Sequence, residues 1–388
     1  MKTNKKKINI FTVILCFSVL VLLGGLIYDY YLESVKFELV EKESILKLDN
    51  TKEYEIIANK NQLIKITSDG IKAYDLKGVE KWSDTLTIKN IKLSQQEPYF
   101  AIADKNGKKI DVYNENGKKN SILTENPIIY FSINKNGDVA VIEDDGDSYI
   151  VSGYTGEGAA KMLQTVTYSK DLEFPMVAKI SPDSKSLLIS YIDLKQSIIS
   201  SNIVSIPLST PSEQSKYPIQ YALVETDNLV YDLEFISDKK WVSIGDHFIH
   251  WYTSEGTLIQ KVSNGEVAYY PQLNDFPKRE SVALIENSPT QKPDAYNKGI
   301  LKIYNNKGGL KAEKTFPNII DFAIATSDEI ILKANNTYYG LNYRGQVLFE
   351  SESETPYRKI FVFSGNRYVG VKDDEVVLFD KKAKKKGA

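Results

Sequence analysis

A short motif that recurs along most of the chain constrains its fold more than any other feature. In each copy a strand-like run ends in Tyr, polar residues follow, and Gly stands four places after the Tyr. The copies read AYDLKG, VYNENG, GYTGEG, WYTSEG and IYNNKG, with Tyr74, Tyr113, Tyr154, Tyr252 and Tyr304. Leu341 in GLNYRG and Phe379 in LFDKKA take the Tyr position in two weaker copies. The motif predicts a β-hairpin whose aromatic residue points inward and whose Gly supplies a positive φ.

The spacing of the motif predicts a repeat fold. Neighbouring copies lie 39, 41, 98, 52, 37 and 38 residues apart, and the interval of 98 fits two repeats with a degraded copy at 204–209. Two more strand-like runs precede each copy, so each unit holds four short strands in roughly 40–45 residues, the spacing of propeller blades. The first strands are expected near Tyr54, Ile91, Ile128, Met176, Val230, Tyr270, Ile320 and Ile360.

The fold class that follows is all-β: a β-propeller with eight four-stranded blades. Seven blades is an alternative if the unit between Met176 and Leu229 is miscounted. An open solenoid and a pair of β-sandwiches are further alternatives. We expect the propeller at residues 35–380.

The two ends of the repeat region indicate how the ring closes. The last unit runs out after its third strand near Phe379, whereas residues 35–44 belong to no unit. We expect this N-terminal strand to serve as the outer strand of the last blade, because closure removes an exposed sheet edge. The chain then enters on the face where third strands end, and that face should point at the membrane. Blade-to-blade loops and the loops between second and third strands should point outward.

The N-terminal region predicts a membrane anchor. Residues 10–27 carry no charge, and residues 8–27 form about 30 Å of helix at ~1.5 Å per residue, enough to cross a bilayer. Four lysines precede the run and acidic residues follow it, so residues 1–7 should be a cytoplasmic basic tail. We expect one transmembrane helix at 8–28, a linker at 29–34, and a Lys-rich tail at 381–388. A cleaved signal peptide is the alternative, but LIYDYY offers no small-x-small cleavage site.

Composition excludes several classes of function. Four of the 49 basic residues and none of the 51 acidic residues precede residue 29, so the outer domain has an excess of six acidic side chains. Such a domain has no general attraction for nucleic acid. The only cysteine, Cys16, lies in the apolar run, so no intrachain disulfide and no thiolate metal cluster can form. A protein exported by a Gram-positive bacterium fits this cysteine usage.

No set of residues indicates catalysis, a cofactor or a metal. His247 and His250 should lie on opposite faces of a strand. The acidic run EDDGDS at 143–148 could offer oxygen ligands to Ca²⁺, but it lacks the spacing of an EF-hand loop, so a polar hairpin turn is favoured. Three tryptophans are too few for repeated docking of blades around a quinone cofactor.

The repeats resemble a known group. Segments such as GIKAYDLKGVEKW at 70–82 resemble the blades of quinoprotein-like propellers. The basic N-terminus, single helix, YDYYLESVKFELV segment at 28–40 and repeats together resemble an uncharacterised clostridial family, domain of unknown function 5711. This resemblance implies a membrane-anchored propeller and provides no catalytic residues. In plan the chain is also similar to propeller scaffolds that assist envelope assembly.

The expected function is that of an extracytoplasmic interaction scaffold in the cell envelope. The insertion at 286–298 and the blade entry before Pro271 should lie on the outward face, which makes Tyr269, Tyr270, Asp294 and Tyr296 candidate binding residues for a protein partner. A module that binds or senses a cell-wall glycan or small ligand is the alternative, and a hydrolase or lyase is a third. A broad apolar patch on the outward face would favour the protein partner.

Overall fold

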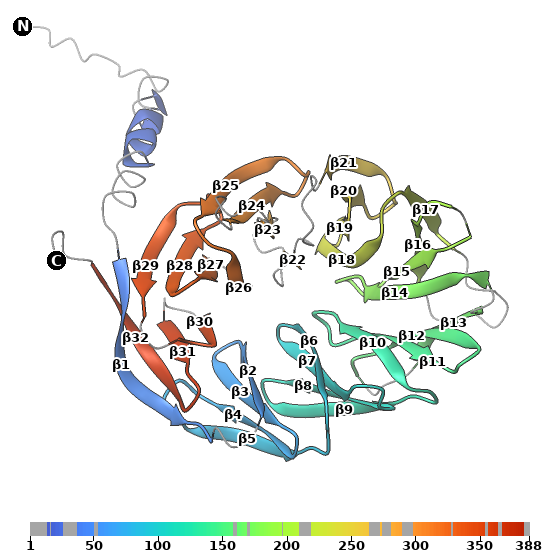
Figure 1. The fold of residues 1–388 in the computed structure, drawn as a ribbon, viewed down its shortest axis with the longest axis horizontal. Coiled ribbons are helices and arrows are strands. Elements are labelled where there is room, and N and C mark those ends of the chain that lie inside the picture. Colours follow the sequence, from blue (N-terminus) through green and yellow to red (C-terminus); the bar gives the residue numbers. More distant parts are fainter. Residues whose placement is uncertain are drawn as a thin grey trace, which may run out of the picture.

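The chain forms a ring of eight antiparallel sheets, which we number as blades one to eight in chain order (Figure 1). The computed structural model describes residues 14–15, 17–25, 37–49, 53–157, 161–168, 171–195, 197–208, 219–263, 272–273, 281–288, 298–326, 329–353, 356–363 and 367–383. Each sheet has four strands. The prediction of eight four-stranded blades is therefore confirmed, and the alternatives of seven blades, an open solenoid and two sandwiches are wrong.

In every blade the first strand lies nearest the axis (Figure 1). The first strands are β2 (Tyr54–Asn59), β6 (Ile91–Gln96), β10 (Ile128–Ile133), β14 (Glu173–Ile180), β18 (Val230–Ser237), β22 (Gln272–Leu273), β26 (Ile320–Ala325) and β30 (Lys359–Phe363). The second strands are β3 (Gln62–Thr67), β7 (Tyr99–Asp104), β11 (Val139–Asp144), β15 (Ser186–Asp193), β19 (Lys240–Gly245), β23 (Ser281–Ser288), β27 (Glu329–Ala334) and β31 (Arg367–Val371).

The other two strands of each blade form its outer half. The third strands are β4 (Gly70–Tyr74), β8 (Lys109–Asn114), β12 (Ser148–Tyr154), β16 (Ser200–Pro207), β20 (Phe248–Thr253), β24 (Lys298–Asn305), β28 (Thr337–Asn342) and β32 (Glu375–Ala383). The outer strands are β5 (Glu80–Thr85), β9 (Gly117–Leu123), β13 (Lys161–Tyr168), β17 (Tyr221–Thr226), β21 (Leu258–Ser263), β25 (Leu310–Phe316), β29 (Val347–Glu352) and, for blade eight, β1 (Phe37–Lys47).

The N-terminal strand completes the last blade. β1 pairs antiparallel with β32, with Phe37 opposite Ala383 and Lys47 opposite Glu375. The Lys47 Nζ atom donates to Glu375 Oε2 at 2.7 Å. From the neighbouring blade seven, Ser351 Oγ donates to the Leu39 carbonyl at 3.2 Å. The predicted closure is confirmed, and the closing strand runs to Lys47 rather than ending near residue 44.

The last strand extends beyond the predicted end of the propeller. β32 ends at Ala383, whereas the sequence predicts a Lys-rich tail that begins at Lys381. The Lys381 Nζ atom lies 5.3 Å from the centre of the Phe37 ring and 5.6 Å from that of Tyr368. Burial among these rings lowers the pKa of Lys381. The prediction of a tail from 381 is wrong because a lysine can pack its aliphatic stem on apolar surface.

Eight buried apolar clusters hold the ring together, and each one joins two neighbouring blades. Between blades one and two, for example, Ile64 and Ile71 pack with Phe100 and Tyr113. A single blade cannot bury both of its faces, so stacking around the ring supplies the core.

The repeated motif forms the hairpin that the sequence predicts. Six of the seven residues at the Tyr position are buried, and Tyr74 is partly buried: the six are Tyr113, Tyr154, Tyr252, Tyr304, Leu341 and Phe379. The turn glycines of five copies have φ between 78° and 100°: Gly78, Gly117, Gly256, Gly308 and Gly345. The last copy forms no turn, because β32 continues through it to Ala383.

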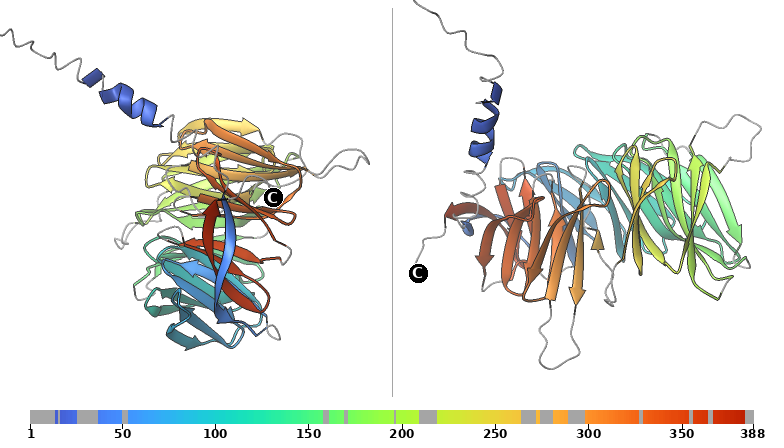
Figure 2. Two further views of the ribbon diagram at one scale, coloured as in Figure 1. Left: turned by 90° about the vertical axis from the view of Figure 1, so that its left-hand side faces the viewer. Right: turned by 90° about the horizontal axis from the view of Figure 1, so that it is seen from above.

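The two faces of the ring carry different connections (Figure 2). Turns from first to second and from third to fourth strands lie on the face where β1 begins, which we call the proximal face. Connections from second to third strands and from blade to blade lie on the distal face. Residues 14, 15 and 17–25 are helical and lie on the proximal side in Figure 2. Among the described residues, no helix combines the length and the apolar character needed to cross a bilayer.

Candidate protein-interaction surface

The four candidate binding residues from the sequence fall outside the described residues. These are Tyr269, Tyr270, Asp294 and Tyr296, and the structure gives no account of their side chains. The strands that flank the insertion are described: β23 ends at Ser288 and β24 begins at Lys298. This is a connection from a second to a third strand, so both strand ends belong to the distal face.

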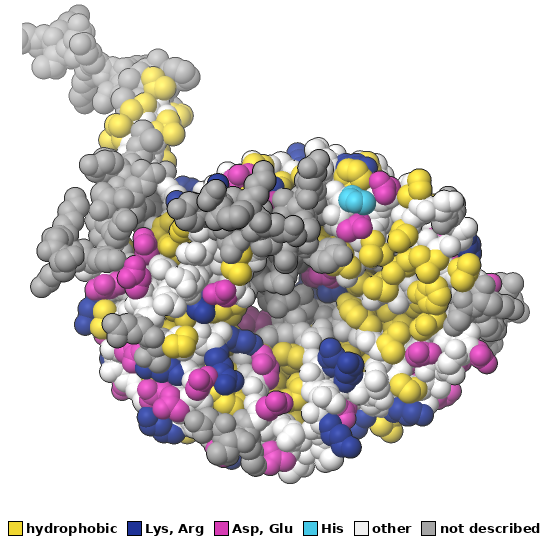
Figure 3. All heavy atoms as spheres, in the orientation of Figure 1, with side chains coloured by type: hydrophobic (Ala, Val, Ile, Leu, Met, Phe, Trp, Pro, Cys, Tyr) yellow, Lys and Arg dark blue, Asp and Glu magenta, His cyan; other side chains and the backbone are white. Residues whose placement is uncertain are grey.

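The distal face of blades three and four carries a broad apolar surface (Figure 3). Six of its side chains are between 38 % and 52 % exposed: Ile129, Leu172, Met176, Leu194, Ile198 and Ile199. Tyr149 and Phe174 lie beside them, with ring centres 5.7 Å apart in an edge-to-face arrangement. We call these eight residues the apolar surface. Large contiguous patches of this kind on a soluble domain mark interaction sites.

Polar contacts beneath the apolar surface fix its two connections in place. The Leu194 amide donates to the Leu172 carbonyl at 3.0 Å, which joins the connection before β14 to the connection after β15. Asn202 Nδ2 donates to Glu173 Oε1 at 3.1 Å, and Lys195 pairs with the same carboxylate at 2.9 Å. The apolar side chains are thus held on a preformed base, which lowers the ordering cost of binding.

The sequence contains a weak signal for this surface, which lies outside the repeated motif. Ile198 and Ile199 follow the polar residues Lys195 and Ser197 in a connection between two strands. Adjacent large apolar residues are unusual in such a connection, because loops run over the surface in water. Their meeting with Leu172 from the preceding blade-to-blade connection depends on the fold and has no signature in the sequence.

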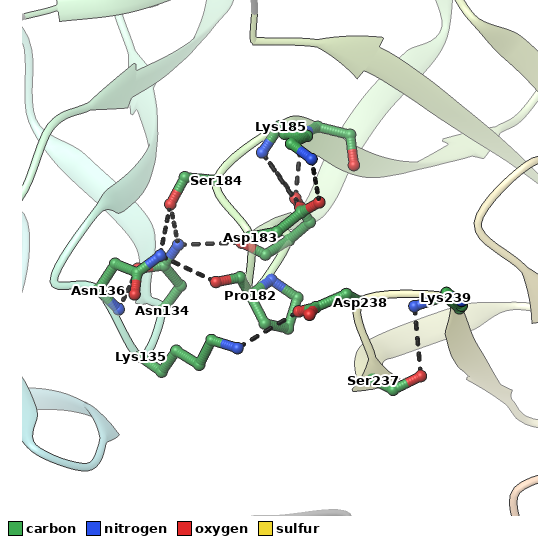
Figure 4. A network of polar contacts seen from close by, with 12 residues as sticks. Asn134, Lys135, Asn136, Pro182, Asp183, Ser184, Lys185, Ser237, Asp238 and Lys239 are labelled. Atoms are coloured by element: carbon green, nitrogen blue, oxygen red, sulfur yellow. Dashed lines mark hydrogen bonds and ion pairs between the residues drawn. The ribbon is translucent and has the colours of Figure 1, made fainter.

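At the proximal mouth of the central channel, polar side chains connect neighbouring turns to one another (Figure 4). Three first-to-second-strand turns meet there, from blades three, four and five. Asn134 Nδ2 donates to the Ser181 carbonyl at 3.0 Å, and Asn136 Nδ2 donates to the Pro182 carbonyl at 2.9 Å. Lys135 Nζ lies 3.3 Å from Asp238 Oδ1. The turns therefore contact one another through hydrogen bonds and an ion pair.

A cavity of about 290 Å³ opens at this mouth, and its charged groups neutralise each other. Lys179 Nζ lies 3.1 Å from Glu234 Oε2 and 3.9 Å from Asp232 Oδ1. Burial acts to lower the pKa of Lys179, but the two carboxylates outweigh it and raise that pKa. Gln96 Nε2 also donates to Glu234 Oε1 at 3.3 Å. A ligand here would have to displace partners that already satisfy the charges, which weakens the case for a small-ligand site.

The candidate metal positions have other partners. His247 is exposed near Asp227 and Asp246, whereas His250 is buried with its Nδ1 atom 2.8 Å from Glu225 Oε2. In the acidic run, Asp144 Oδ1 accepts from the Gly146 amide at 2.8 Å, and Asp145 Oδ1 accepts from the Ser148 amide at 2.6 Å. The favoured hairpin turn is confirmed. Within the described ranges, no three His, Cys, Asp or Glu residues are grouped to hold a metal ion.

Eight carboxyl groups have a pKa that hydrogen bonds or cations lower: Asp75, Glu80, Asp111, Glu115, Asp145, Asp183, Glu255 and Glu375. A general acid at neutral pH needs the opposite shift. These carboxylates stabilise turns and ion pairs.

Comparisons with known proteins agree on the fold. The model of a family of unknown function, DUF5711, matches residues 33–378. The crystal structure of BamB from Moraxella catarrhalis is similar to this chain, with a TM-score of 0.52 and 13% identity over 88% of this chain and 99% of that one. The structure of the Dos1 propeller is similar with a TM-score of 0.50 and 7% identity, over 89% of this chain and 95% of that one. No curated protein matches the sequence.

Proposed function

The chain belongs to the family of unknown function DUF5711, and we propose that it is a membrane-anchored β-propeller that holds a protein partner in the cell envelope. The fold is compatible with such a scaffold, because a propeller presents broad rigid faces built from many connections. In this proposal the propeller lies outside the cell membrane and the N-terminus inside.

The anchor rests on the N-terminal sequence. Residues 10–27 carry no charge, four lysines precede them, and the first acidic residue after them is Asp29. Lysines remain on the cytoplasmic side of an apolar segment, which orients the helix. The described helical residues expose apolar side chains such as Phe17, Leu20 and Leu22, as a segment in contact with lipid does.

The presence of the apolar surface is the main support for a protein partner. It lies on the distal face, opposite the face where β1 begins, so an anchored ring would present it away from the bilayer. Standard protein interfaces bury roughly 800 Å² on each partner and are centred on apolar anchors. Eight apolar side chains on two adjacent blades provide such a centre.

We propose binding without catalysis. The downward-shifted carboxyl pKa values and the mutually neutralised charges of the channel support a structural role for the polar groups. The Tyr149 hydroxyl is the one polar side-chain group among the eight residues of the apolar surface, so this surface offers little hydrogen bonding to a sugar. A protein surface of complementary shape is the occupant that it fits best.

The test places charge on the apolar surface of the full-length protein. Ile198→Asp combined with Ile199→Asp should lower recovery of the crosslinked partner from solubilised membranes by about tenfold or more, because burying each carboxylate in an interface carries a desolvation penalty. Crosslinked complexes are purified through a C-terminal tag and quantified by mass spectrometry.

Val79→Asp is the matched control, because Val79 is also exposed and apolar but lies after a proximal turn of blade one. This variant should recover the same partner as the unmodified protein. Equal thermal unfolding of all variants shows that folding is unaffected. Recovery of the same proteins in the same amounts with the double variant would contradict the proposal.

A further inference from the structure

A groove of about 630 Å³ runs between the outer halves of blades three and four. One wall is residues 164–167 of β13, and the floor is the side of β16 and β17 that faces blade three. The groove ends at Glu173 and Tyr191, next to Phe174 of the apolar surface. It therefore continues the surface toward the rim of the ring.

The floor of the groove is an apolar, partly uncovered sheet face. Val204 and Ile206 of β16 line it, and Val204 is the register partner of Ala222 on β17. Val224 of β17 is 67 % exposed and Val166 of β13 is 44 % exposed. In the other direction β17 turns Tyr221 and Leu223 toward the core shared with blade five. The floor is thus one face of a sheet whose opposite face is buried.

The wall of the groove is a free strand edge. β13 is the last strand of its sheet and, in the part of the chain that the structure describes, pairs only with β12. Four consecutive residues of β13 line the groove. Because successive side chains of a strand point to opposite faces, four in a row mean that the backbone edge itself borders the groove.

The outer strands of the eight blades differ in how many exposed charged side chains they carry. An exposed charged side chain within an outer strand discourages pairing with another chain. β1, β5, β9, β21 and β25 each carry one inside the strand, and β29 carries the part-buried Glu350 inside and the exposed Glu352 at its end; in β13 the only charged residue is the exposed Lys161 at its start, and in β17 it is the buried Glu225. The part of β13 after Lys161 and the whole of β17 therefore lack this protection along the groove.

The groove is also electrically neutral. Its one charged lining residue is Glu173, whose carboxylate is engaged by Lys195 at 2.9 Å and by Asn202 at 3.1 Å. A charged segment would find no counter-charge there and would lose hydration on entry. The complementary occupant is a segment without charge.

We infer that the groove binds an extended, uncharged segment of a protein partner as a fifth strand of blade three. Neighbouring strands lie about 4.8 Å apart, so a strand added to β13 would lie over the floor formed by Val204, Ala222 and Val224. Its alternate side chains would pack on that floor, which favours Val, Ile or Thr at every second position. This inference rests on the proposed function and names how the partner is held.

The test measures binding of a defined probe to the full-length protein in lipid nanodiscs. The probe is a fluorescent ten-residue peptide in which Val alternates with Ser and Thr, and empty nanodiscs are the blank. Anisotropy should show saturable binding. The combination of Val166→Lys and Val224→Lys should weaken binding by about tenfold or more, because it places charges on the edge and the floor.

Two controls make the result specific. Leu123→Lys alters another exposed apolar residue, on the outer strand of blade two, and should leave binding unchanged. A probe whose alternate amides are N-methylated cannot complete the ladder and should bind at least about tenfold more weakly. Equal binding of both probes, or equal weakening by Leu123→Lys, would overturn the inference.

Partner recovery separates this inference from the proposed function. One outcome is that Ile198→Asp with Ile199→Asp releases the partner but Val166→Lys with Val224→Lys does not. The groove is then not the binding site of the partner, and the scaffold proposal stands. If neither pair releases it, the scaffold proposal fails. Dimerisation of the purified protein that Val166→Lys abolishes would show that the edge pairs with a second copy, which also overturns the inference.

Discussion

At the scale of single residues, buried polar groups join neighbouring blades. Glu225 of β17 accepts hydrogen bonds from Ser243 Oγ at 2.6 Å, Asn228 Nδ2 at 2.6 Å and Tyr252 Oη at 3.0 Å. His250 lies 2.8 Å from the same carboxylate. Burial and this carboxylate raise the pKa of Tyr252. The sequence indicated that His250 is not a ligand, but its partner could not be predicted, because Glu225 comes from the preceding blade.

Removing this acceptor should destabilise the ring. Glu225→Ala leaves several buried donors without a partner, and we expect it to lower the free energy of unfolding by about 3 kcal/mol. Glu255→Ala, in an exposed turn of blade five, is the control and should leave the free energy of unfolding nearly unchanged. Urea unfolding followed by tryptophan fluorescence measures both. Equal losses in the two variants would mean that the Glu225 network contributes no more than a surface carboxylate.

At the scale of the elements, the spacing of the repeated motif and the strand-like runs before each copy were enough to locate the blades. First strands begin at Tyr54, Ile91, Ile128, Val230 and Ile320, as expected. β14, β22 and β30 begin within three residues of their expected starts. These positions are predictable because strand period and turn residues are local properties.

The end of the last strand was not predictable in this way. Composition alone makes KKAKKKGA a tail, yet Lys381 packs against Phe37 of β1 and Tyr368 of β31. Tyr368 lies on the neighbouring strand of the same blade, but Phe37 comes from the other end of the chain, so only closure of the ring brings its aromatic ring to the lysine. Local composition therefore placed the boundary three residues early.

The closing pair of strands should respond to acid. Hydrogen bonds from Lys47 and Ser44 lower the pKa of Glu375 to about 2. The ionised carboxylate therefore stabilises the fold above its ordinary pKa, and this stabilisation is lost as the pH falls toward 2. Thermal unfolding at pH 7 should separate the unmodified protein from Glu375→Gln, and the difference should shrink at pH 3. A difference of the same size at both pH values would exclude Glu375 as a source of closure stability.

At the scale of the whole molecule, closure sets the direction of the two faces. Phe37 pairs with Ala383 at the proximal end of blade eight, so the chain enters the ring opposite the apolar surface. The sequence predicted binding residues on the outward face at blade six, which lie outside the described residues, and it did not predict the apolar surface on blades three and four. Leu172 and Leu194 meet through a backbone hydrogen bond between two connections, and nothing local to either segment indicates that contact.

The central claim is that the apolar surface faces a partner outside the cell. In a Cys16→Ser background, Ile199→Cys and Val79→Cys are treated in intact cells with a maleimide photocrosslinker that does not cross membranes. Both cysteines should react with the reagent. After irradiation, the crosslinker on Ile199→Cys should give a discrete adduct with another protein, and the crosslinker on Val79→Cys should not give this adduct. Failure of the reagent to reach Ile199→Cys, or the same adducts at both positions, would contradict the account.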